Sequence, residues 1–114
     1  MNFNRGSVVL VRFPNSDLKT CKKRPALVVQ ADNLYLGLSQ RIVAMITSNV
    51  GRTGPTRVFV TKNSELGKHM GIIQDSVVVA DNLATVQDRE IEKVIGRCSD
   101  PAPVDQALRA VLGL

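Results

Sequence analysis

Tryptophan is absent from this chain, cysteine occurs only twice, and no long apolar run is present. Cys21 and Cys98 lie far apart and belong to no metal-spaced pair, so we expect free thiols in a reducing, cytoplasmic environment. No stretch approaches the roughly 20 apolar residues that are needed to cross a bilayer. The segment "MNFNRGSVVLVRF" (residues 1–13) also lacks the apolar core of a signal peptide. These absences argue against membrane insertion and against a metal site built from paired cysteines.

The length and charge of the chain limit the number of domains and the kinds of partner to expect. The chain has 114 residues, of which 44% are hydrophobic, which is enough for one compact core and predicts a single domain over residues 1–114. The formal net charge is +5 and the isoelectric point is about 9.7. Such a charge favours a polyanionic partner, either nucleic acid or an acidic protein segment, and is equally compatible with a surface that is basic only for solubility.

Short β-rich runs alternate with turn-forming residues along most of the chain, which predicts a small, mostly antiparallel barrel. The segment "PNSD" (residues 14–17) is expected to end the first strand, and the glycines and proline of "VGRTGP" (residues 50–55) separate the third from the fourth. The segment "KNSELGKHMG" (residues 62–71) is expected to be a loop with at most one helical turn. The expected strands are residues 8–13, 26–30, 42–46, 56–60 and 72–80, with a further short strand or turn near Val94 and Ile95.

The last residues of the chain are the only ones that read clearly as a helix. Asp100 is a suitable N-cap, and Pro101 fits the first helical position. Apolar residues then recur at helical spacing at Val104, Ala107, Leu108, Val111 and Leu112. We expect this apolar face to pack on the barrel.

The segment "CKKRPALVV" (residues 21–29) places the densest positive charge directly before a buried strand. Arginine carries a planar fork of donors that matches phosphate oxygens, and Pro25 fixes the backbone where Arg24 would enter the strand. For Lys22 and Lys23 two hypotheses remain open: they bind phosphate, or they are solvent-exposed charges at the end of a loop with no functional role.

A second polar group follows a later apolar strand. Thr47 and Ser48 stand at the end of the run 42–46, so two hydroxyls are expected at a strand end. The alternative for both residues is ordinary turn chemistry, in which a hydroxyl bonds its own backbone.

Four segments, in this order and spacing, resemble the MazF/PemK-type toxins of bacterial toxin–antitoxin systems. The first, "RGSVVLVRFPNSDLKTCKKRPALVV", is similar to the opening R-G-D-I-V-L-V-x-F-P-F-T-D-L-S-G-S-K-R-R-P-A-L-V-V of that family. The others are "AMITSN", "DSVVVADNLATV", which is similar to D-S-x-x-x-x-D-Q-x-x-T-V, and "IGRCSDPAPVDQALRAVLGL". The resemblance spans nearly the whole chain, and the ordered set is more specific than any single segment.

The resemblance implies an SH3-like barrel that forms homodimers and acts as a metal-independent endoribonuclease on single-stranded RNA, with no cofactor. Arg24 matches the catalytic arginine of the family, Thr47 its catalytic threonine, and Asp81 an acidic position that some members use. In this chemistry the RNA 2′-hydroxyl attacks its own phosphorus, so the protein must orient the strand and stabilise charge on the phosphoryl oxygens. The expected products are a 2′,3′-cyclic phosphate and a 5′-hydroxyl.

The general base is the least defined part of this hypothesis. Arginine side chains are effectively always protonated and make poor bases. Asp81 is a possible base or an orienting partner of Arg24, and its alternative is a turn carboxylate. His69 is interpreted as a loop histidine, because no family motif falls on it.

Several positions depart from the family pattern. Ser7 replaces an aspartate, Asn82 replaces a glutamine, and the loop over residues 15–23 lacks the usual glycine, so its effect on specificity is open. Lys19, together with Lys22 and Lys23, is a candidate for positioning phosphates, which would give salt-sensitive affinity with little base specificity. Ser48 is the fourth candidate for binding RNA.

The few aromatic residues limit how this chain would recognise bases. Unpaired bases usually stack on aromatic rings, and the sequence has only three phenylalanines and one tyrosine. We expect Phe13 and Phe59 to belong to the core and Tyr35 to be the one aromatic at a surface. Base recognition would then depend on groove shape and hydrogen bonds.

Two rival functions remain open on the sequence alone. A toxin of the same fold can bind DNA gyrase without catalysis, but the members that do so rely on a tryptophan near the C-terminus, and this chain ends in "VLGL". A catalytically silent nucleic-acid-binding barrel would need only the basic charge. The resemblance also implies an antitoxin partner whose acidic, flexible segment folds along the basic groove.

Overall fold

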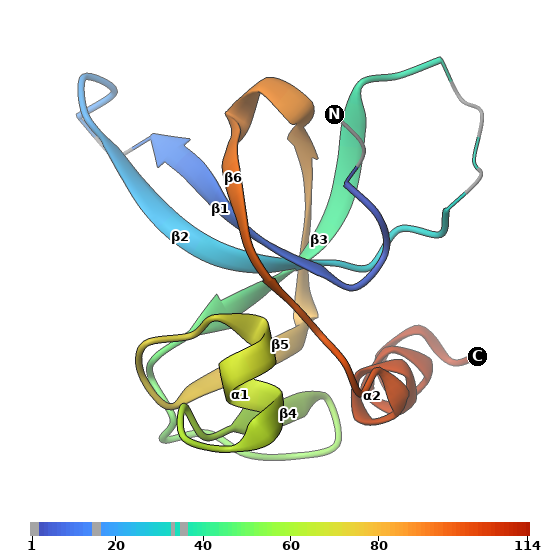
Figure 1. The fold of residues 1–114 in the computed structure, drawn as a ribbon. Coiled ribbons are helices and arrows are strands. Elements are labelled where there is room, and N and C mark those ends of the chain that lie inside the picture. Colours follow the sequence, from blue (N-terminus) through green and yellow to red (C-terminus); the bar gives the residue numbers. More distant parts are fainter. Residues whose placement is uncertain (1–2, 15–16, 33, 35–36) are drawn as a thin grey trace.

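The computed structural model describes residues 3–14, 17–32, 34 and 37–114. Six strands form one antiparallel sheet in the order β4-β5-β3-β2-β1-β6, and the chain reaches a C-terminal helix after the last strand (Figure 1). The prediction of a mostly antiparallel β-fold with a C-terminal helix is confirmed. The strands are β1 (Ser7–Pro14), β2 (Cys21–Val28), β3 (Gln40–Thr47), β4 (Arg57–Val60), β5 (Ser76–Gln87) and β6 (Ile91–Arg97).

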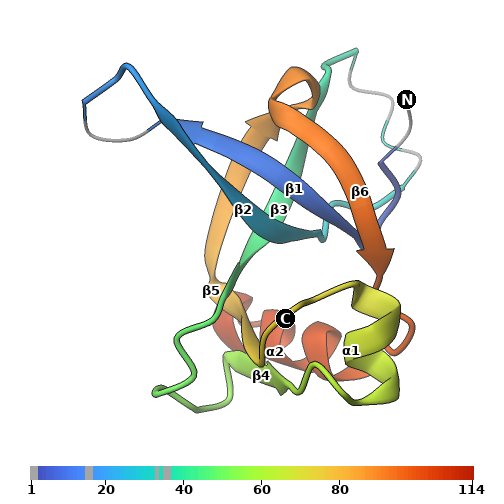
Figure 2. The same ribbon diagram turned by 60° about the vertical axis from the view of Figure 1, so that its left-hand side comes forward.

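The sheet curves like a barrel but stays open on one side. Among the described residues, no strand pairing joins the two edge strands, β4 and β6. Helix α1 (Glu65–Met70) contacts β6, and helix α2 (Ala102–Leu112) contacts β4 and β5. Figure 2 shows both helices and β4 on the same side of the remaining strands. The expected barrel is therefore an open, barrel-like sheet with the two helices packed along its gap.

Apolar side chains gather in two clusters on opposite faces of the sheet, because successive residues of a strand point to opposite faces. The helix-side cluster contains Leu27, Ile46 and Val78 from the strands and Val104 and Leu108 from α2. The open-face cluster contains Phe3, Val9, Val11, Ala26, Val28, Val43, Val86 and Ile91, with Phe13 and Met45 packed against it. The expectation that Phe13 belongs to the core is confirmed.

The boundaries of β2 and β5 differ most from the sequence prediction, and those of β1, β3 and β4 differ by one or two residues. β2 begins at Cys21 rather than residue 26, so Arg24 lies within the strand and not at its entry. Pairing with β1 explains this extension, since Lys22 lies opposite Phe13 and Arg24 opposite Val11. β5 begins at Ser76 rather than residue 72, and it continues to Gln87, seven residues beyond the expected end at Ala80, because β3 pairs with its second half.

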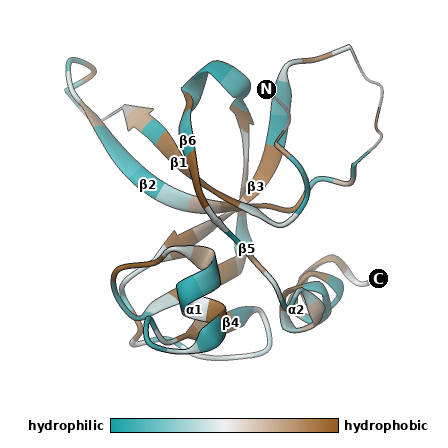
Figure 3. Cartoon of the chain, viewed as in Figure 1, coloured by the Kyte–Doolittle hydropathy of each residue, from teal (hydrophilic) through white to brown (hydrophobic). Residues whose placement is uncertain are grey.

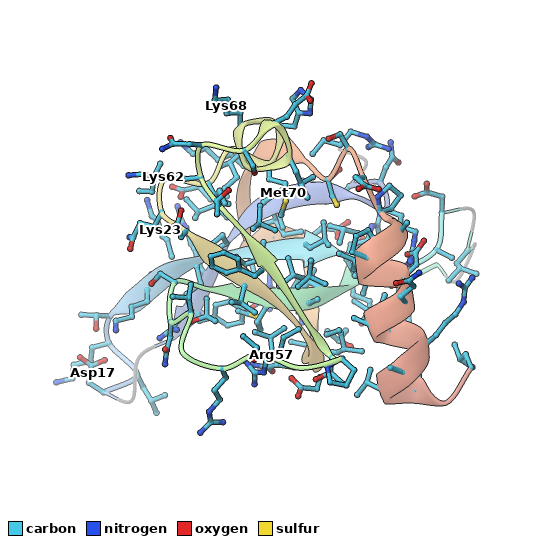
Figure 4. The ribbon with its side chains drawn as sticks, turned by 90° about the horizontal axis from the view of Figure 1, so that it is seen from below. Asp17, Lys23, Arg57, Lys62, Lys68 and Met70 are labelled. Atoms are coloured by element: carbon cyan, nitrogen blue, oxygen red, sulfur yellow. The ribbon has the colours of Figure 1, made fainter. Side chains whose placement is uncertain are left out.

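Helix α1 replaces what the sequence predicts as a loop with at most one turn. Ser64 caps it by accepting a hydrogen bond from the Gly67 N–H at 2.9 Å. A Cβ on Gly96 would lie 2.3 Å from the Met70 backbone, so only a glycine at position 96 lets the helix end rest on β6. Figure 4 shows Met70 directed into the interior below α1 and Lys68 directed outward from it.

The expected start of the C-terminal helix is displaced by one residue. Pro101 rather than Asp100 occupies the N-cap of α2, and no side chain caps the first turn. Asp100 instead accepts a bond from the Cys98 thiol on its backbone oxygen at 3.4 Å. The prediction of the helix is confirmed, and Val104, Ala107 and Leu108 are buried as expected. Val111 and Leu112 were expected on the same packed face but are exposed, because the last turn of α2 extends past the core.

Candidate active site

Strands β2 and β3 separate at one residue, and the separation exposes the site. Their pairing covers Ala26–Met45, Leu27–Ala44 and Val28–Val43. The Val29 N–H donates to the Ile42 carbonyl at 3.1 Å, and alternate N–H groups of a strand point to the same neighbour. By this alternation the N–H of residue 25 would be the next to donate to β3, but residue 25 is a proline and has no N–H. Pro25 ends the ladder.

Arg24 and Thr47 stand on either side of this opening. Continuing the register of β2 and β3 by two residues beyond Ala26 and Met45 places Arg24 opposite Thr47. Both side chains line a cavity of about 320 Å³. The other residues that line this cavity are Met45, Ile46, Asn49, Arg52, Arg57, Val79, Asp81 and Asn82. Three arginines face one carboxylate there, which leaves the cavity electropositive and suited to an anion.

A bulge in β5 brings Asp81 to the same cavity. Ala44 pairs with Leu83 and the next residue, Met45, pairs with Val79, so Ala80, Asp81 and Asn82 are extra on β5. Such a bulge re-aims side chains out of the regular alternation of a strand. The structure thus brings together Arg24, Thr47 and Asp81, which the sequence selected from three separate segments.

Asp81 contacts Arg57 on β4 and Thr56, the residue that precedes β4. Its Oδ2 accepts a hydrogen bond from the Thr56 hydroxyl at 3.1 Å. Its Oδ1 lies 3.7 Å from a guanidinium nitrogen of Arg57, whose side chain is only 19% exposed. Asp81 therefore orients Arg57, and the interpretation of Asp81 as the orienting partner of Arg24 gains no support from these contacts.

The hydroxyl of Thr47 is held in a defined direction. Its Oγ1 accepts a hydrogen bond from the Asn49 N–H at 3.1 Å. The side chain of Asn49 in turn accepts from the Gly51 N–H at 3.3 Å, which fixes the turn after β3. Because the backbone occupies one lone pair of Oγ1, the Thr47 hydroxyl hydrogen is free to be donated into the cavity. The Thr47 hydroxyl can thus accept a hydrogen bond within the turn and still donate one to a ligand.

A second, more apolar cavity of about 590 Å³ adjoins Arg24 and Thr47. Its apolar lining comes from β1, β2, β3, β6 and the segment after α1, and includes Leu10, Pro25, Ile46, Ile72, Ile73 and Ile95. Besides Arg24 and Thr47, six polar or basic side chains border it: Lys22, Lys23, Ser48, Gln74, Ser76 and Lys93. Arg24 and Thr47 thus lie between a polar cavity and an apolar one with basic residues along it.

The candidate RNA-binding lysines differ in their surroundings. Lys22 and Lys23 line the apolar cavity, but Lys19 is absent from the described lining of both cavities. The Lys23 ammonium lies 2.8 Å from Glu92, which also lies 3.5 Å from Arg12. The hydrogen bond from Lys23 lowers the pKa of Glu92 below its ordinary value. Lys23 is therefore partly neutralised where the sequence suggested a free cation.

Lys19 belongs to the turn that joins β1 to β2. The Asp17 carboxylate accepts from the N–H of Lys19 at 2.9 Å and of Thr20 at 3.0 Å, and these backbone bonds lower the pKa of Asp17. Leu18 takes a left-handed backbone with φ of 59°, where glycine is usual. In Figure 4 Asp17 lies at the tip of this turn, well away from Arg57.

The sequence reasoning missed Arg52 and Arg57 in the polar cavity. The available signal was the alternation in "TRVFV" (residues 56–60), which is typical of a half-exposed strand and puts Arg57 on the face opposite Val58 and Val60. The prediction that Phe59 belongs to the core is wrong, because its side chain is 52% exposed. Tyr35 lies outside the described residues.

His69, interpreted as a loop residue, lies instead in the last turn of α1. Its Nδ1 is 2.8 Å from the Ser99 hydroxyl, and it is absent from the described lining of both cavities.

Two kinds of structural feature are absent from the described residues. No helix among them is long and apolar enough to span a membrane. Within the same part of the chain, no group of three or more His, Cys, Asp or Glu side chains is placed to hold a metal ion.

Comparisons with known proteins identify the family and agree with the fold. Residues 4–112 match the family described as the PemK-like, MazF-like toxin of type II toxin–antitoxin systems. No curated protein matches the chain. The chain belongs to the PemK-like, MazF-like toxin family, as its motifs predicted.

Solved structures of toxins share this fold. The Mycobacterium tuberculosis toxin MazF-mt6 is 25% identical with a TM-score of 0.73, and the match covers 95% of this chain and 97% of that one. A mycobacterial endoribonuclease in complex with its cognate antitoxin is 21% identical with a TM-score of 0.73, covering 99% and 97%. A MazE–MazF structure from Deinococcus radiodurans is 20% identical with a TM-score of 0.73, covering 100% and 98%.

Proposed function

We propose that this toxin is a metal-independent, sequence-selective endoribonuclease that cuts single-stranded RNA in the cytoplasm and thereby inhibits translation and growth. The observation that carries the proposal is the opposition of Arg24 and Thr47 across the opening between β2 and β3, in a cavity that also contains Arg52 and Arg57. Phosphate oxygens suit such a site, because guanidinium groups donate paired hydrogen bonds to them.

The chemistry follows from what RNA supplies and what the protein must add. The 2′-hydroxyl next to the scissile phosphate attacks phosphorus, the bond to the 5′-oxygen breaks, and a 2′,3′-cyclic phosphate and a 5′-hydroxyl result. Negative charge rises on the non-bridging oxygens in the transition state. Arg24 stabilises that charge, and the Thr47 hydroxyl donates a hydrogen bond to the same oxygens. Both groups are preset by strands, so little reorganisation is needed during the reaction.

The apolar cavity supports a protein partner beside the active site. Its isoleucine and leucine side chains are bordered by Lys22, Lys23 and Lys93, which suits an antitoxin segment that carries both acidic and apolar residues. Such a segment, disordered when free, would fold onto the groove and cover Arg24. A homodimer, which the family resemblance implies, is part of the same proposal.

The test of catalysis uses a long single-stranded RNA incubated with purified protein in EDTA, with Arg24→Ala and Arg24→Lys in parallel. Discrete cuts by the wild type that leave cyclic phosphates, no cuts by Arg24→Ala and weak cutting by Arg24→Lys would support the assignment. Lysine retains the charge without the planar fork of donors, so it is the matched control. Equal cutting by Arg24→Ala would remove Arg24 from the site.

No cutting by any folded protein would instead favour a non-catalytic toxin or nucleic-acid binder. Inhibition of DNA gyrase would then be the next assay. For the partner, titration with a synthetic peptide from the neighbouring antitoxin gene should protect Lys22 and Lys93 from amine labelling. Absence of any affinity would remove the antitoxin from the proposal.

A further inference from the structure

Edge strand β4 presents two large side chains on the face that carries Thr47. Thr47 pairs with Val77 on β5, and Val77 pairs with Phe59 on β4. In the adjacent row Met45 pairs with Val79, which pairs with Arg57. Directly paired residues project from the same face of a sheet. Arg57 and Phe59 therefore stand beside the active site, two strands away from Thr47.

Burial of the neighbouring residues supports this placement. Val58 and Val60, which alternate with Arg57 and Phe59 on β4, pack in the helix-side cluster. Arg57 and Phe59 consequently point to the opposite face, away from α2 and its core. Strands in a sheet are about 4.8 Å apart, so the backbone at Phe59 lies about 10 Å from that at Thr47. Neighbouring nucleotides of one strand can therefore contact both positions.

The two side chains present complementary chemistry. Arg57 lines the polar cavity and is held by Asp81, so its guanidinium is oriented before any ligand arrives. Phe59 is 52% exposed on a four-residue edge strand, although single exposed apolar residues are common on protein surfaces. What distinguishes Phe59 is its position in one cross-strand row with Thr47. A cation for phosphate next to an exposed ring for a base is the usual composition of a single-strand binding site.

We propose that β4 is a nucleotide-binding extension of the active site, in which Arg57 contacts a phosphate next to the scissile one and Phe59 stacks on an unpaired base. The proposal rests on the proposed function for the choice of RNA as ligand. Asp81 is then a positioning residue that acts through Arg57. The extension also supplies the aromatic surface that the composition of the chain had argued against.

The test measures binding and does not depend on cleavage. A fluorescently labelled single-stranded RNA of about ten nucleotides, with 2′-fluoro sugars that cannot attack phosphorus, is titrated with wild type, Phe59→Leu, Phe59→Tyr and Arg57→Ala. Leucine keeps apolar cover over Val77 but removes the ring, and tyrosine keeps the ring. Each variant is first checked for its unfolding midpoint and its mass in solution.

Phe59→Leu should weaken binding about 5- to 150-fold without changing its salt dependence, because stacking is not a charge interaction. Phe59→Tyr should bind like the wild type. Arg57→Ala should reduce the slope of log affinity against log salt by about 0.7, which is the contribution of one phosphate contact to a single strand. A 2-aminopurine base placed at successive positions should change its fluorescence at one position with the wild type and not with Phe59→Leu.

Three outcomes would overturn the extension. They are wild-type binding by Phe59→Leu, an unchanged salt slope for Arg57→Ala, and a change in oligomeric state for Phe59→Leu, which would place Phe59 between two copies of the chain. If natural RNA is cut while Phe59→Leu binds normally, the extension fails and the ribonuclease stands. If natural RNA is not cut while Phe59→Leu binds weakly, the ribonuclease fails and the extension stands.

Discussion

The outer and inner halves of β2 differ in their exposure to solvent. Residues 21–24 are all exposed, and residues 26–28 are all buried. Figure 3 shows the same change of character along β2, from a hydrophilic outer part to a less polar inner part. Both halves pair with β1, so the difference lies in the second neighbour: only the inner half also pairs with β3.

This contrast shows how one strand can serve both stability and function. The inner half fixes the register through side chains in both core clusters, Leu27 on the helix side and Ala26 and Val28 on the open face. The outer half inherits that register and carries Arg24 to the opening on a rigid element. Sites on strands hold their geometry better than sites on loops. Mutations in the outer half should therefore change the cleavage rate, and mutations in the inner half should change the free energy of unfolding.

The largest expected effect comes from one substitution in each half. Arg24→Ala should lower the cleavage rate at least about 100-fold, since a donor to the developing charge is lost. The free energy of unfolding should stay within about 0.5 kcal/mol of the wild type, because Arg24 is exposed. Leu27→Ala should lower the free energy of unfolding by about 2–5 kcal/mol through a cavity in the core.

Urea unfolding and single-turnover cleavage measure the two quantities separately. Below the unfolding transition, Leu27→Ala should cut RNA at the wild-type rate. A loss of stability in Arg24→Ala as large as that in Leu27→Ala would show that the outer half is structural, and the contrast would be lost.

Pro25→Ala should extend the pairing of β2 with β3 from the inner half into the outer half. The new N–H can donate to β3, extend the ladder and draw Arg24 towards Thr47. We expect cleavage to fall about 10- to 100-fold, because small displacements of positioned groups have effects of this size. Hydrogen exchange at the new amide should show protection. Full activity with a protected amide would mean that the opening is not needed for the reaction.

Asp81→Asn tests whether Asp81 positions Arg57 or accepts a proton. The amide keeps the hydrogen bond from Thr56 but loses the ion pair, and exposed ion pairs contribute about 0.2–1 kcal/mol. We expect cleavage to fall no more than about 5-fold, with the pH profile of the reaction unchanged. Loss of about 100-fold or more, together with loss of the acidic limb of the pH profile, would make Asp81 the general base.

The smallest expected effect is on RNA affinity and comes from Lys23 and Arg12, the cations beside the outer half of β2. Glu92→Gln should release Lys23 and Arg12, and RNA affinity at low salt should rise about 2- to 5-fold with a steeper salt dependence. Because the pKa of Glu92 is lowered in the folded state, its contribution to stability is present above the ordinary carboxyl pKa and disappears as the pH falls through the lowered value. Wild type and Glu92→Gln should therefore converge in unfolding midpoint at acidic pH. An affinity that does not rise would mean that Lys23 does not meet RNA.

Patterns of apolar and polar residues within a segment predicted those helices and strands whose formation depends mainly on the segment itself. The apolar run at β3, the alternation at β4 and the helical spacing before Leu112 each specify their own element. The missed boundaries depend on partners: residues 21–25 join β2 only because β1 lies beside them, and residues 81–87 join β5 only because β3 does. Sequence periodicity carries no information about such neighbours.

The candidate site was predictable to the extent that it rests on family motifs. Arg24, Thr47 and Asp81 were selected in this way, and the structure brings them to one cavity. Arg52 and Arg57 fall outside those motifs and reach the cavity through tertiary packing alone. The contact of Asp81 with Arg57 was likewise inaccessible, because it depends on the β5 bulge and on the β4–β5 pairing.

The pairing of β1 with β6 has a consequence for how the protein is made. Ser7 lies opposite Arg97, so the first strand to leave the ribosome waits for the last strand before the sheet is complete (Figure 1). Contacts between such distant segments form slowly, because the long intervening chain must first be ordered. Arg24, Thr47 and Asp81 are all synthesised before β6. A nascent chain therefore carries all three residues of the proposed site before the finished fold that would align them has formed.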